Sequence, residues 1–494
     1  MIDKKPYWYL KSLCWLALAG ILTGCFPERA PVSSRMILFT LTPSLVPTVI
    51  KGTLTPSRPL YQPVELVDYT VQPGDTLPVL AVRFNTTVKE IRAANPVLPA
   101  EVTTLPPGLP LKIPIYYLPL WGSPYQIIPD SLFVNGPAQV GFDPAAFVAS
   151  RHGWLKDYQE YAYDGERSGV EIVVEIANSY SVSPRLLLAL LEYQAGALTL
   201  EQQPPESIDY PLGYRDAGHK GLYMQLNCVA NYLNNAFYQY LDGKLTSFDH
   251  LDGRMERPDP WQNAATVALQ YYFARYLDGD AYQAAISSSG LARSLSQLFG
   301  DPWKNVQPLI PGSLQQPNLL LPFKTGKTWA YTGGPHTGWG NGVPLAAIDF
   351  APGVTGCGET DEWSTAVADG IIVRTGDGLA ILDLDGDNDE RTGWSVLYLH
   401  LSKRDMPLVG KRVKAGDPIG HPSCEGGYAT GTHIHIARKY NGEWMSADGV
   451  LPFNLEGWLA ANGSDAYLGT LTRGSQTVRA CTCSDPPSFI TAGK

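Results

Sequence analysis

The sequence predicts a multidomain α+β protein, because three stretches of the chain follow three different patterns. Residues 69–115 show a strand, two short helices and a second strand, and apolar residues recur at helical spacing from about 145 to 299. From about 322 to 460, short β-like runs recur, such as the alternating run 396–401 and the run that contains His433 and His435. At roughly 150 residues per domain, 494 residues leave room for about three domains. We therefore expect a small βααβ module, an α-helical middle domain and a C-terminal antiparallel all-β domain.

The composition is that of an ordinary globular protein. Hydrophobic residues make up 44% of the chain and charged residues 17%, which is enough apolar content to form real cores. The formal net charge is −10, and no basic cluster is present. Binding to nucleic acid depends on clustered Lys and Arg, so we expect no nucleic acid partner.

Residues 1–24 have the composition of a targeting segment. Three lysines precede the apolar run 13–22, which is shorter than the stretch of about 20 residues that spans a bilayer. The run ends in Leu-Thr-Gly-Cys25, which resembles the bacterial lipobox and implies that Cys25 is lipidated. We expect an exported lipoprotein, held at the membrane by lipid alone and facing the cell wall or periplasm. An ordinary secretory signal and a retained anchor are the alternatives.

Residues 25–67 are rich in Pro, Ser and Thr, a composition typical of an extended tether. Residues 68–116 then contain the predicted βααβ module. Its first strand ends in a Pro-Gly turn, and its second helix, over 87–94, is ended by Asn95-Pro96. The module resembles a LysM domain. The resemblance implies that it binds glycans containing N-acetylglucosamine, such as peptidoglycan; an inert spacer is the alternative.

Residues 145–300 are predicted to form the helical domain. Apolar residues in 169–180 have helical spacing, and Ser183 is a predicted N-cap with Pro184 at the first helical position. A further helix is predicted over 263–277.

Two phrases in this domain, 187–196 and 221–226, faintly resemble the lysozyme-like helices of lytic transglycosylases. In that family a glutamate is the general acid, and the aligned residue here is Gln194, which cannot donate a proton. Glu192, two positions earlier, is a candidate glycan acid. An ordinary surface or buried, paired glutamate is the alternative.

Residues 301–321, rich in Pro, Gln and Asn, are predicted to be a linker, 322–462 the β domain and 463–494 a C-terminal tail. Five of the eight histidines lie in this last third of the chain: His336, His400, His421, His433 and His435.

His433 and His435 flank one apolar residue in a β-like run, so both rings face one side of a strand. Two strand histidines that merely alternate are the alternative for an isolated pair. Here His336 and Asp349 lie upstream. A catalytic zinc takes three protein ligands and keeps one position open, and His336, Asp349 and His435 would supply that set.

These residues resemble the zinc metallopeptidases of the lysostaphin and LytM type, which cut peptidoglycan peptides, and most closely their β-lytic branch. In the commoner branch the ligand histidine precedes the aspartate by four residues, a position that Leu345 occupies here, so His336 is expected to come from a Gly-rich loop. The resemblance implies that one zinc ion is bound by His336, Asp349 and His435, while His433 and His400 act on the attacking water and the oxyanion. Which of these two histidines does which stays open.

Cys357 and Cys424 both lie in the predicted β domain and could pair in an oxidising compartment. By the resemblance, Cys424 occupies a disulfide position of the β-lytic branch, whereas Cys357 is not at the usual partner position. A turn rich in acidic residues is a candidate calcium site, although its glycine is not where an EF-hand needs it, and a solvated hairpin turn is the favoured interpretation. Its carboxylates are Asp383, Asp385, Asp387 and Asp389.

We therefore expect a zinc metalloendopeptidase that hydrolyses peptide cross-links of peptidoglycan, anchored to the membrane by lipid and to glycan by the LysM-like module. Two alternatives stay open. One is a non-catalytic regulator of wall amidases, and the other is an enzyme that cleaves glycan through its helical domain.

Overall fold

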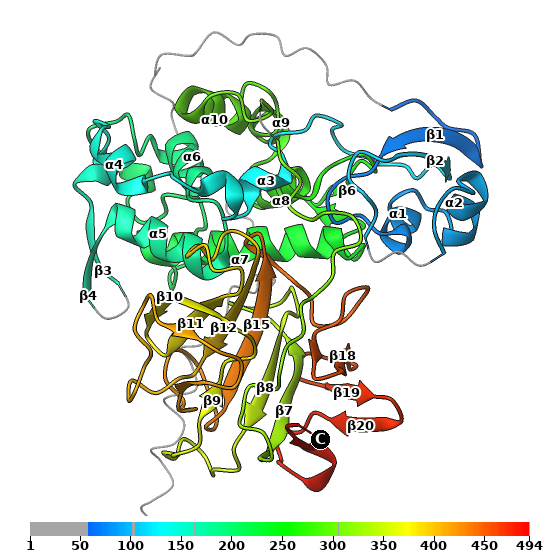
Figure 1. Cartoon of the computed structure of the whole chain (residues 1–494). Coiled ribbons are helices and arrows are strands. Elements are labelled where there is room, and N and C mark those ends of the chain that lie inside the picture. Colours follow the sequence, from blue (N-terminus) through cyan, green and yellow to red (C-terminus); the bar gives the residue numbers. More distant parts are fainter. Residues whose placement is uncertain (1–57, 101–103, 163–164, 305, 494) are drawn as a thin grey trace, which may run out of the picture. The chain divides into compact units, whose positions relative to one another are not determined.

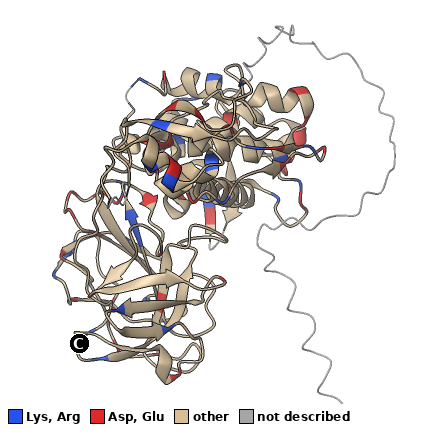
Figure 2. Cartoon of the chain, turned by 90° about the vertical axis from the view of Figure 1, so that its right-hand side faces the viewer, with Lys and Arg blue, Asp and Glu red and all other residues tan. Residues whose placement is uncertain are grey.

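The computed structural model describes residues 58–100, 104–162, 165–304 and 306–493 (Figure 1). The predicted targeting segment, Cys25 and most of the predicted tether lie outside these ranges. Among the described residues, no helix has both the length and the apolar character needed to cross a membrane. Basic and acidic residues are interspersed along the described ribbon (Figure 2).

The N-terminal module has the predicted βααβ order. Its strands β1 (Glu65–Thr70) and β2 (Pro110–Ile115) pair antiparallel, and the helices α1 (Leu77–Arg83) and α2 (Val88–Ala94) lie between them in sequence. The Thr76 side chain accepts a hydrogen bond from the first turn of α1, and Thr87 and Glu90 form a capping box at α2. These local signals are the reason that the sequence predicted the module.

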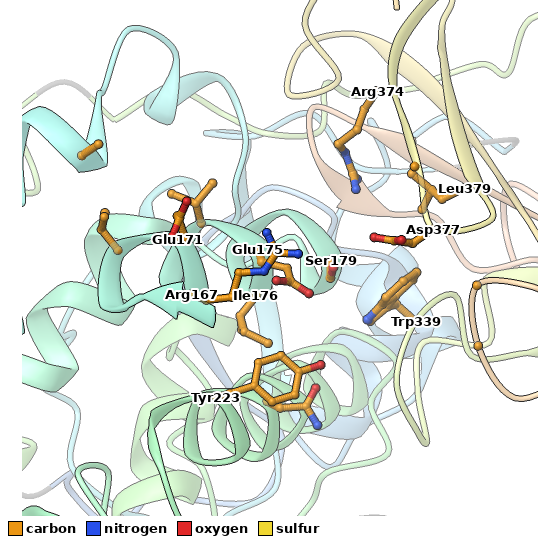
Figure 3. Close-up of a pocket in the computed structure, with 17 residues that line it drawn as sticks. Arg167, Glu171, Glu175, Ile176, Ser179, Tyr223, Trp339, Arg374, Asp377 and Leu379 are labelled. Carbon is orange, nitrogen blue, oxygen red and sulfur yellow. The ribbon is translucent and has the colours of Figure 1, made fainter. Parts of the chain in front are cut away.

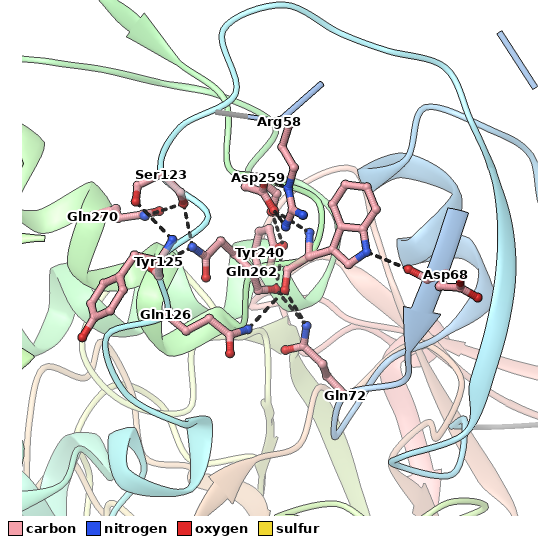
Figure 4. A network of polar contacts seen from close by, with 11 residues as sticks. Arg58, Asp68, Gln72, Ser123, Tyr125, Gln126, Tyr240, Asp259, Gln262 and Gln270 are labelled. Atoms are coloured by element: carbon pink, nitrogen blue, oxygen red, sulfur yellow. Dashed lines mark hydrogen bonds and ion pairs between the residues drawn. The ribbon is translucent and has the colours of Figure 1, made fainter. Parts of the chain in front are cut away.

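A polar network joins this module to the helical part of the chain (Figure 4). The Trp261 indole N–H donates to the Asp68 carbonyl at 2.9 Å, and the Gln72 amide donates to the Trp261 carbonyl at 3.0 Å. Arg58 forms an ion pair with the buried Asp259 at 2.7 Å. Arg58 belongs to the stretch predicted as an extended tether, so the end of that stretch is ordered against the helices.

Three helices of the helical part lie where the sequence predicted them. Ser168 and Glu171 form a capping box at the first long helix, Ser183 caps the next with Pro184 in its first turn, and Asn263 precedes a third. The helices are α3 (Asp130–Phe133), α4 (Pro144–Ala149), α5 (Gly169–Tyr180), α6 (Pro184–Ala195), α7 (Leu222–Leu241), α8 (Ala264–Tyr276), α9 (Gly279–Ala285) and α10 (Leu291–Phe299). A short hairpin, β3 (Gln159–Ala162) and β4 (Gly165–Ser168), precedes α5.

The C-terminal part contains a large antiparallel sheet, as predicted. In the described chain this sheet has nine strands in the order β13-β10-β11-β12-β15-β8-β7-β21, with β16 paired to β15. Their bounds are β7 (Thr328–His336), β8 (Ala347–Ala351), β10 (Gly370–Gly376), β11 (Leu379–Asp383), β12 (Trp394–Leu399), β13 (Arg412–Val413), β15 (Ile434–Tyr440), β16 (Glu443–Trp444) and β21 (Phe489–Thr491). A second sheet contains β17 (Asn454–Leu455), β18 (Trp458–Asn462), β19 (Gly469–Arg473) and β20 (Gln476–Arg479), and β9 (Ser364–Thr365) pairs with β14 (Pro418–Gly420).

The large sheet is buried on both faces. On one face, Leu397 and Ala437 belong to the same hydrophobic core as the helices. On the other face, Tyr398 and Ile436 belong to a second core that includes side chains of the smaller sheet. Because side chains alternate along a strand, His435 lies on the same face as Ala437. The helices therefore pack on the sheet face that also carries the histidines.

Hydrogen bonds accompany this shared core. The Trp444 backbone N–H donates to the Tyr238 hydroxyl at 2.9 Å, and the Trp444 indole donates to the Tyr180 carbonyl at 3.2 Å. The Ser181 hydroxyl donates to the Gly442 carbonyl at 2.6 Å. These three hydrogen bonds pair the polar groups that they join, which offsets the cost of burying those groups.

Two segments differ from the sequence-based prediction. The predicted tail, 463–494, contains β19, β20 and β21, and β21 pairs with β7, so this segment is part of the β fold. The predicted linker, 301–321, has no regular element among its described residues, but it is not solvated throughout, because Leu309 and Ile310 are buried in the helical core.

Candidate functional site

Three adjacent strands bring the predicted metal ligands together. His435 on β15 and Asp349 on β8 are paired directly across the sheet, and His336 ends β7, next to Ala347 of β8. Two irregularities between Tyr331 and His336 shift the register of β7. The expectation that His336 comes from a loop is therefore wrong, because the Gly-Gly-Pro-His segment is the bulged end of a strand.

The three side chains are buried and converge on a common point. His336 Nε2 lies 2.9 Å from His435 Nδ1 and 3.2 Å from Asp349 Oδ1, and His435 Nδ1 lies 3.3 Å from the same oxygen. In a tetrahedral zinc site with bonds of about 2.1 Å, neighbouring ligand atoms lie about 3.4 Å apart. Asp349 Oδ1 is buried and has no hydrogen-bond partner, so this donor set fits a divalent cation of the zinc type.

Backbone carbonyls fix the tautomer of the histidines. A carbonyl oxygen only accepts, so the ring nitrogen that faces it must carry the proton. His336 Nδ1 faces the Gly334 carbonyl at 2.8 Å, and His435 Nε2 faces the Gly338 carbonyl at 3.3 Å. Each ring therefore turns its unprotonated nitrogen toward Asp349, which is the form that binds a metal.

His433 and His400 lie beside this group and have the same arrangement. His433 Nδ1 donates to the Gly431 carbonyl at 2.7 Å, and His400 Nδ1 donates to the Glu425 carbonyl at 2.8 Å. The two ring centroids are 4.5 Å apart, and His433 Nε2 lies 3.9 Å from Asp349 Oδ2. His400 follows β12 with a φ of 66°, an uncommon backbone conformation for a residue other than glycine. Two further unprotonated nitrogens thus face the cleft.

The charges of the site follow from burial and proximity. Burial opposes ionisation of Asp349, but the neighbouring His336 and His433 hold the pKa of its carboxyl well below the usual range. Burial lowers the pKa of His435. Burial, with His433 and His435 nearby, lowers the pKa of His400 to about 3. Burial opposes protonation of His336, but the neighbouring Asp349 raises the pKa of its ring. The site therefore combines one carboxylate with imidazoles that differ in basicity.

The histidines open into a cavity of about 580 Å³, one wall of which comes from the segment predicted as a tail. Tyr467 stacks on His336 with centroids 4.1 Å apart and an angle of 19° between the rings, and it holds this position with a φ of 67°. Thr482, Cys483 and Ser484 also line the cavity. Tyr467 was missed in the sequence, because no spacing rule links it to His336.

The structure pairs Cys357 with Cys424 in a disulfide, with Cα atoms 5.7 Å apart. The bridge ties the two loops that border the cavity. Next to it, the Thr432 backbone N–H donates to the Gly356 carbonyl at 2.7 Å. The loop that carries His433 is thereby braced against the loop that contains Cys357.

The remaining histidine of this third of the chain, His421, and the candidate glycan acid, Glu192, lie elsewhere. His421 is not part of the cluster, since its Nδ1 donates to the Glu362 carbonyl and its ring packs on Trp363. Glu192 accepts from the Leu198 backbone N–H at 2.8 Å and from the Thr199 hydroxyl at 2.6 Å, which are the contacts of a paired glutamate that closes the turn after α6.

The acidic turn joins β11 to β12, as predicted. Asp383, Asp385 and Asp387 place oxygens within 4.8 Å of one another, while Asp389 forms a two-pronged contact with Arg391. Burial and the neighbouring Asp385 raise the pKa of Asp383 to about 7. The turn is held by its own hydrogen bonds, such as that from the Asn388 backbone N–H to Asp383 at 3.0 Å.

Two imidazoles and a carboxylate that converge on one antiparallel sheet form a site of the metallopeptidase class. Comparison with known proteins supports this class. Residues 69–114 match the LysM domain, and residues 126–313 match the family described as LasA, N-terminal domain. A β-lytic metalloendopeptidase of Lysobacter enzymogenes is 31% identical over 145 residues, covering 27% of this chain and 76% of that protein. The chain belongs to the β-lytic metalloendopeptidase family. The predicted LysM-containing metallopeptidase of the LytM type is thus confirmed.

Other relatives cover different shares of the chain. Protease LasA of Pseudomonas aeruginosa (strain UCBPP-PA14) is 24% identical over 358 residues, covering 69% of this chain and 78% of that protein. A solved structure described as the M23 metalloprotease pseudoalterin is 24% identical, with a TM-score of 0.29, and covers 33% of this chain and 96% of that one. The catalytic domain of lysostaphin from Staphylococcus simulans is 27% identical, with a TM-score of 0.18, and the match covers 25% of this chain and 89% of that one.

Proposed function

We propose that this protein is a zinc-dependent endopeptidase that hydrolyses peptide cross-links in peptidoglycan. The observation that carries the proposal is the convergence of two imidazole nitrogens and one carboxylate oxygen within 3.3 Å of one another, beside two further imidazoles. In this proposal His336, Asp349 and His435 hold the zinc. The peptide substrate class comes from the family to which the chain belongs.

Zinc bound there would act as a Lewis acid, which acidifies water to a pKa of about 7 and polarises a scissile carbonyl. The protein's own part begins with His433. Its unprotonated Nε2 faces the cleft and can take a proton from the attacking water. The imidazolium so formed lies 3.9 Å from Asp349 Oδ2, which stabilises its charge until the proton passes to the leaving amine.

His400 has a different part. Its Nδ1–H donates to the backbone carbonyl of Glu425, and the pKa of its ring is lowered to about 3. Near neutral pH, His400 therefore presents only the unprotonated Nε2, a hydrogen-bond acceptor, to the cleft. In this form it can hydrogen-bond and orient the attacking water. It can stabilise an oxyanion only after a proton has reached it, and His433, 4.5 Å away, is the nearby source. We therefore assign proton transfer to His433 and water positioning to His400.

Attachment to the wall completes the proposal. The LysM domain would bind glycan, and lipid on Cys25 would hold an exported chain at the membrane, with the metallopeptidase part facing the wall. The two contacts would place the catalytic site near its polymeric substrate and raise the local substrate concentration.

Zinc stoichiometry and muropeptide analysis test the proposal together. We expect about one zinc ion per chain and the loss of cross-linked muropeptides on incubation with purified wall. His336→Ala should abolish both. His421→Ala is the matched control, because His421 is a buried histidine of the same sheet region with no contact to the cluster. Absence of zinc together with intact cross-links would contradict the proposal and favour a non-catalytic regulator.

A further inference from the structure

The loop that joins β7 to β8, residues 337–346, touches all three proposed metal ligands. It begins directly after His336 and leads into the strand that carries Asp349. It also reaches the third ligand, because His435 Nε2–H donates to the Gly338 carbonyl at 3.3 Å. The conformation of this loop therefore sets which way the His435 ring faces and which of its nitrogens is unprotonated. We call it the β7–β8 loop.

Helix α7 of the helical part holds the middle of the β7–β8 loop through two asparagines. Asn231 Oδ1 accepts from the Asn341 backbone N–H at 2.9 Å. Asn235 Oδ1 accepts from the Val343 backbone N–H at 3.0 Å, and its Nδ2 donates to the Asn341 carbonyl at 2.8 Å. Residues four positions apart lie on the same face of a helix, so both side chains meet the loop together. Three backbone groups of the loop thus find their hydrogen-bond partners on α7.

The sequence of the loop fits this contact. A Cβ on Gly342 would lie 2.0 Å from Asn235 Oδ1, and a Cβ on Gly340 would lie 2.6 Å from Asn231 Oδ1. Both glycines also have a positive φ, of 93° and 73°, which residues with a side chain rarely adopt. Glycine at these two positions therefore allows the loop backbone to approach the two asparagines.

The beginning of the loop packs against Trp444. A Cβ on Gly338 would lie 2.8 Å from the Trp444 ring, so the loop backbone lies directly on this ring. The indole of Trp444 in turn donates to the Tyr180 carbonyl at the end of α5. Gly338 thus contacts both a tryptophan that the helices hold and the His435 ring that its carbonyl orients. A continuous set of contacts joins the helical part to the metal site.

The same loop carries Trp339 into a second cavity. This cavity, of about 620 Å³, lies outside the histidine cavity, and Figure 3 shows Trp339 among its lining side chains. Gly427 also lines it, and a Cβ on Gly427 would lie 3.6 Å from the His400 ring. The β7–β8 loop therefore extends from the proposed metal ligands to a cavity beside the proposed catalytic histidines.

We infer that Asn231 and Asn235 are positioning residues of the metal site. Neither lines the histidine cavity. They act through the β7–β8 loop, which they hold in the conformation that aims the Gly338 carbonyl at His435 Nε2–H and leaves Nδ1 of that ring free for a metal. This inference rests on the proposed function. It gives the helical part a direct role in building the metal site.

Metal binding and hydrogen exchange test the inference in the full chain. The metal-free protein is titrated with Co²⁺, whose visible absorption reports the coordination geometry, and hydrogen exchange over 337–346 is measured without metal. Asn235→Ala loses two contacts with the loop, so it should weaken Co²⁺ binding about tenfold, shift the absorption bands and accelerate loop exchange. Asn231→Ala loses one contact and should show the same changes to a smaller extent.

Asn234→Ala is the matched control. Asn234 is a buried asparagine of the same helix, but its Nδ2 donates to the Tyr180 carbonyl at 2.7 Å, and it makes no hydrogen bond to residues 337–346, all of which the structure describes. This variant should lose stability and keep the Co²⁺ affinity and spectrum of the wild type. Asn341→Ala should also bind Co²⁺ normally, because α7 bonds to the backbone of Asn341.

Three outcomes would overturn the inference. The first is wild-type Co²⁺ affinity and absorption in both Asn231→Ala and Asn235→Ala, and the second is unchanged loop exchange in both. The third is an equal loss of Co²⁺ binding in Asn234→Ala, which would reflect general loosening of the helices. A wild-type chain that binds no Co²⁺ would refute the proposed function and the inference with it. The three outcomes above, in contrast, are differences among variants of a metal-binding chain and leave the proposed function standing.

Discussion

Glu443 provides a test of how tightly the helices pack on the sheet. It lies on β16, is 8% exposed, and precedes Trp444, which bonds to Tyr238 of α7. Burial, with the charge of Asp130 nearby, raises the pKa of the Glu443 carboxyl from 4.5 to about 8. We predict that Glu443→Gln, which keeps the shape and removes the ionisation, changes how stability depends on pH.

The sign and size follow from proton linkage. Below pH 4.5 the carboxyl is protonated in both the folded and unfolded chain, so its ionisation contributes nothing there. Between about pH 4.5 and 8 the folded protein holds a proton that the unfolded chain has lost, so the free energy of unfolding falls as pH rises. At 1.36 kcal/mol per pH unit, the fall over this window is on the order of 4 kcal/mol. The glutamine variant lacks this contribution.

Urea unfolding followed by tryptophan fluorescence measures the effect at pH 5, 6.5 and 8. We expect the variant to resemble the wild type near pH 5 and to be more stable by on the order of 4 kcal/mol at pH 8. Glu166→Gln, at an exposed site, should follow the wild type at every pH. If wild type and Glu443→Gln gave parallel curves, the carboxyl would titrate as it does in water, and the described packing of β16 against the helices would be wrong.

Three further predictions concern the site and the domain contacts. A Cβ at Gly333 would lie 2.2 Å from Asp349 Oδ2, so Gly333→Ala should displace the carboxylate and lower zinc affinity about 10- to 100-fold by isothermal titration. Gly165→Ala, where a Cβ meets open space, is the control and should not lower it. Equal zinc affinity in the two variants would contradict the assigned ligand. The Cys357–Cys424 bridge spans 67 residues, so replacing both cysteines by serine should lower the free energy of unfolding, measured in urea, by about 4 kcal/mol. A second disulfide joins Cys481 to Cys483, only two residues apart, and its replacement by serines should cost less than half of that. Trp261→Ala removes a hydrogen bond to the Asp68 carbonyl and a ring contact with Phe84. Hydrogen exchange over 69–115 should therefore accelerate by the factor that corresponds to a fall of about 3 kcal/mol in the free energy of opening. Trp303→Ala, at a more exposed site, should leave this exchange unchanged.

The elements that the sequence predicted are those whose signals are local. Ser183 and Pro184 start α6 through contacts within one turn, and the LysM module is bounded by its own turns and caps. Within the candidate site, the His433 and His435 spacing lies in one strand end, and Asp349 follows a short apolar run that forms its neighbour strand. Local pattern was enough to nominate these residues.

The parts that sequence reasoning missed depend on distant pairing. Strand β21 gains its partner, β7, from some 160 residues earlier, and its three residues show no alternation of their own. Tyr467 stacks on His336 because its backbone turns at a positive φ. This conformation is uncommon for tyrosine, and the sequence contains no signal that predicts it. Nor could the sequence say what covers Trp444, since an apolar residue predicts burial without naming its partner.

The common interior of the helices and the sheet bears on how the protein can be handled. A fragment limited to residues 322–494 would turn Leu397, Leu399 and Trp444 outward to water. An apolar stripe of that kind promotes self-association, so such a fragment should precipitate where the longer chain stays dispersed. Activity lost in a truncated protein would then reflect aggregation of the fragment rather than the catalytic role of the deleted residues.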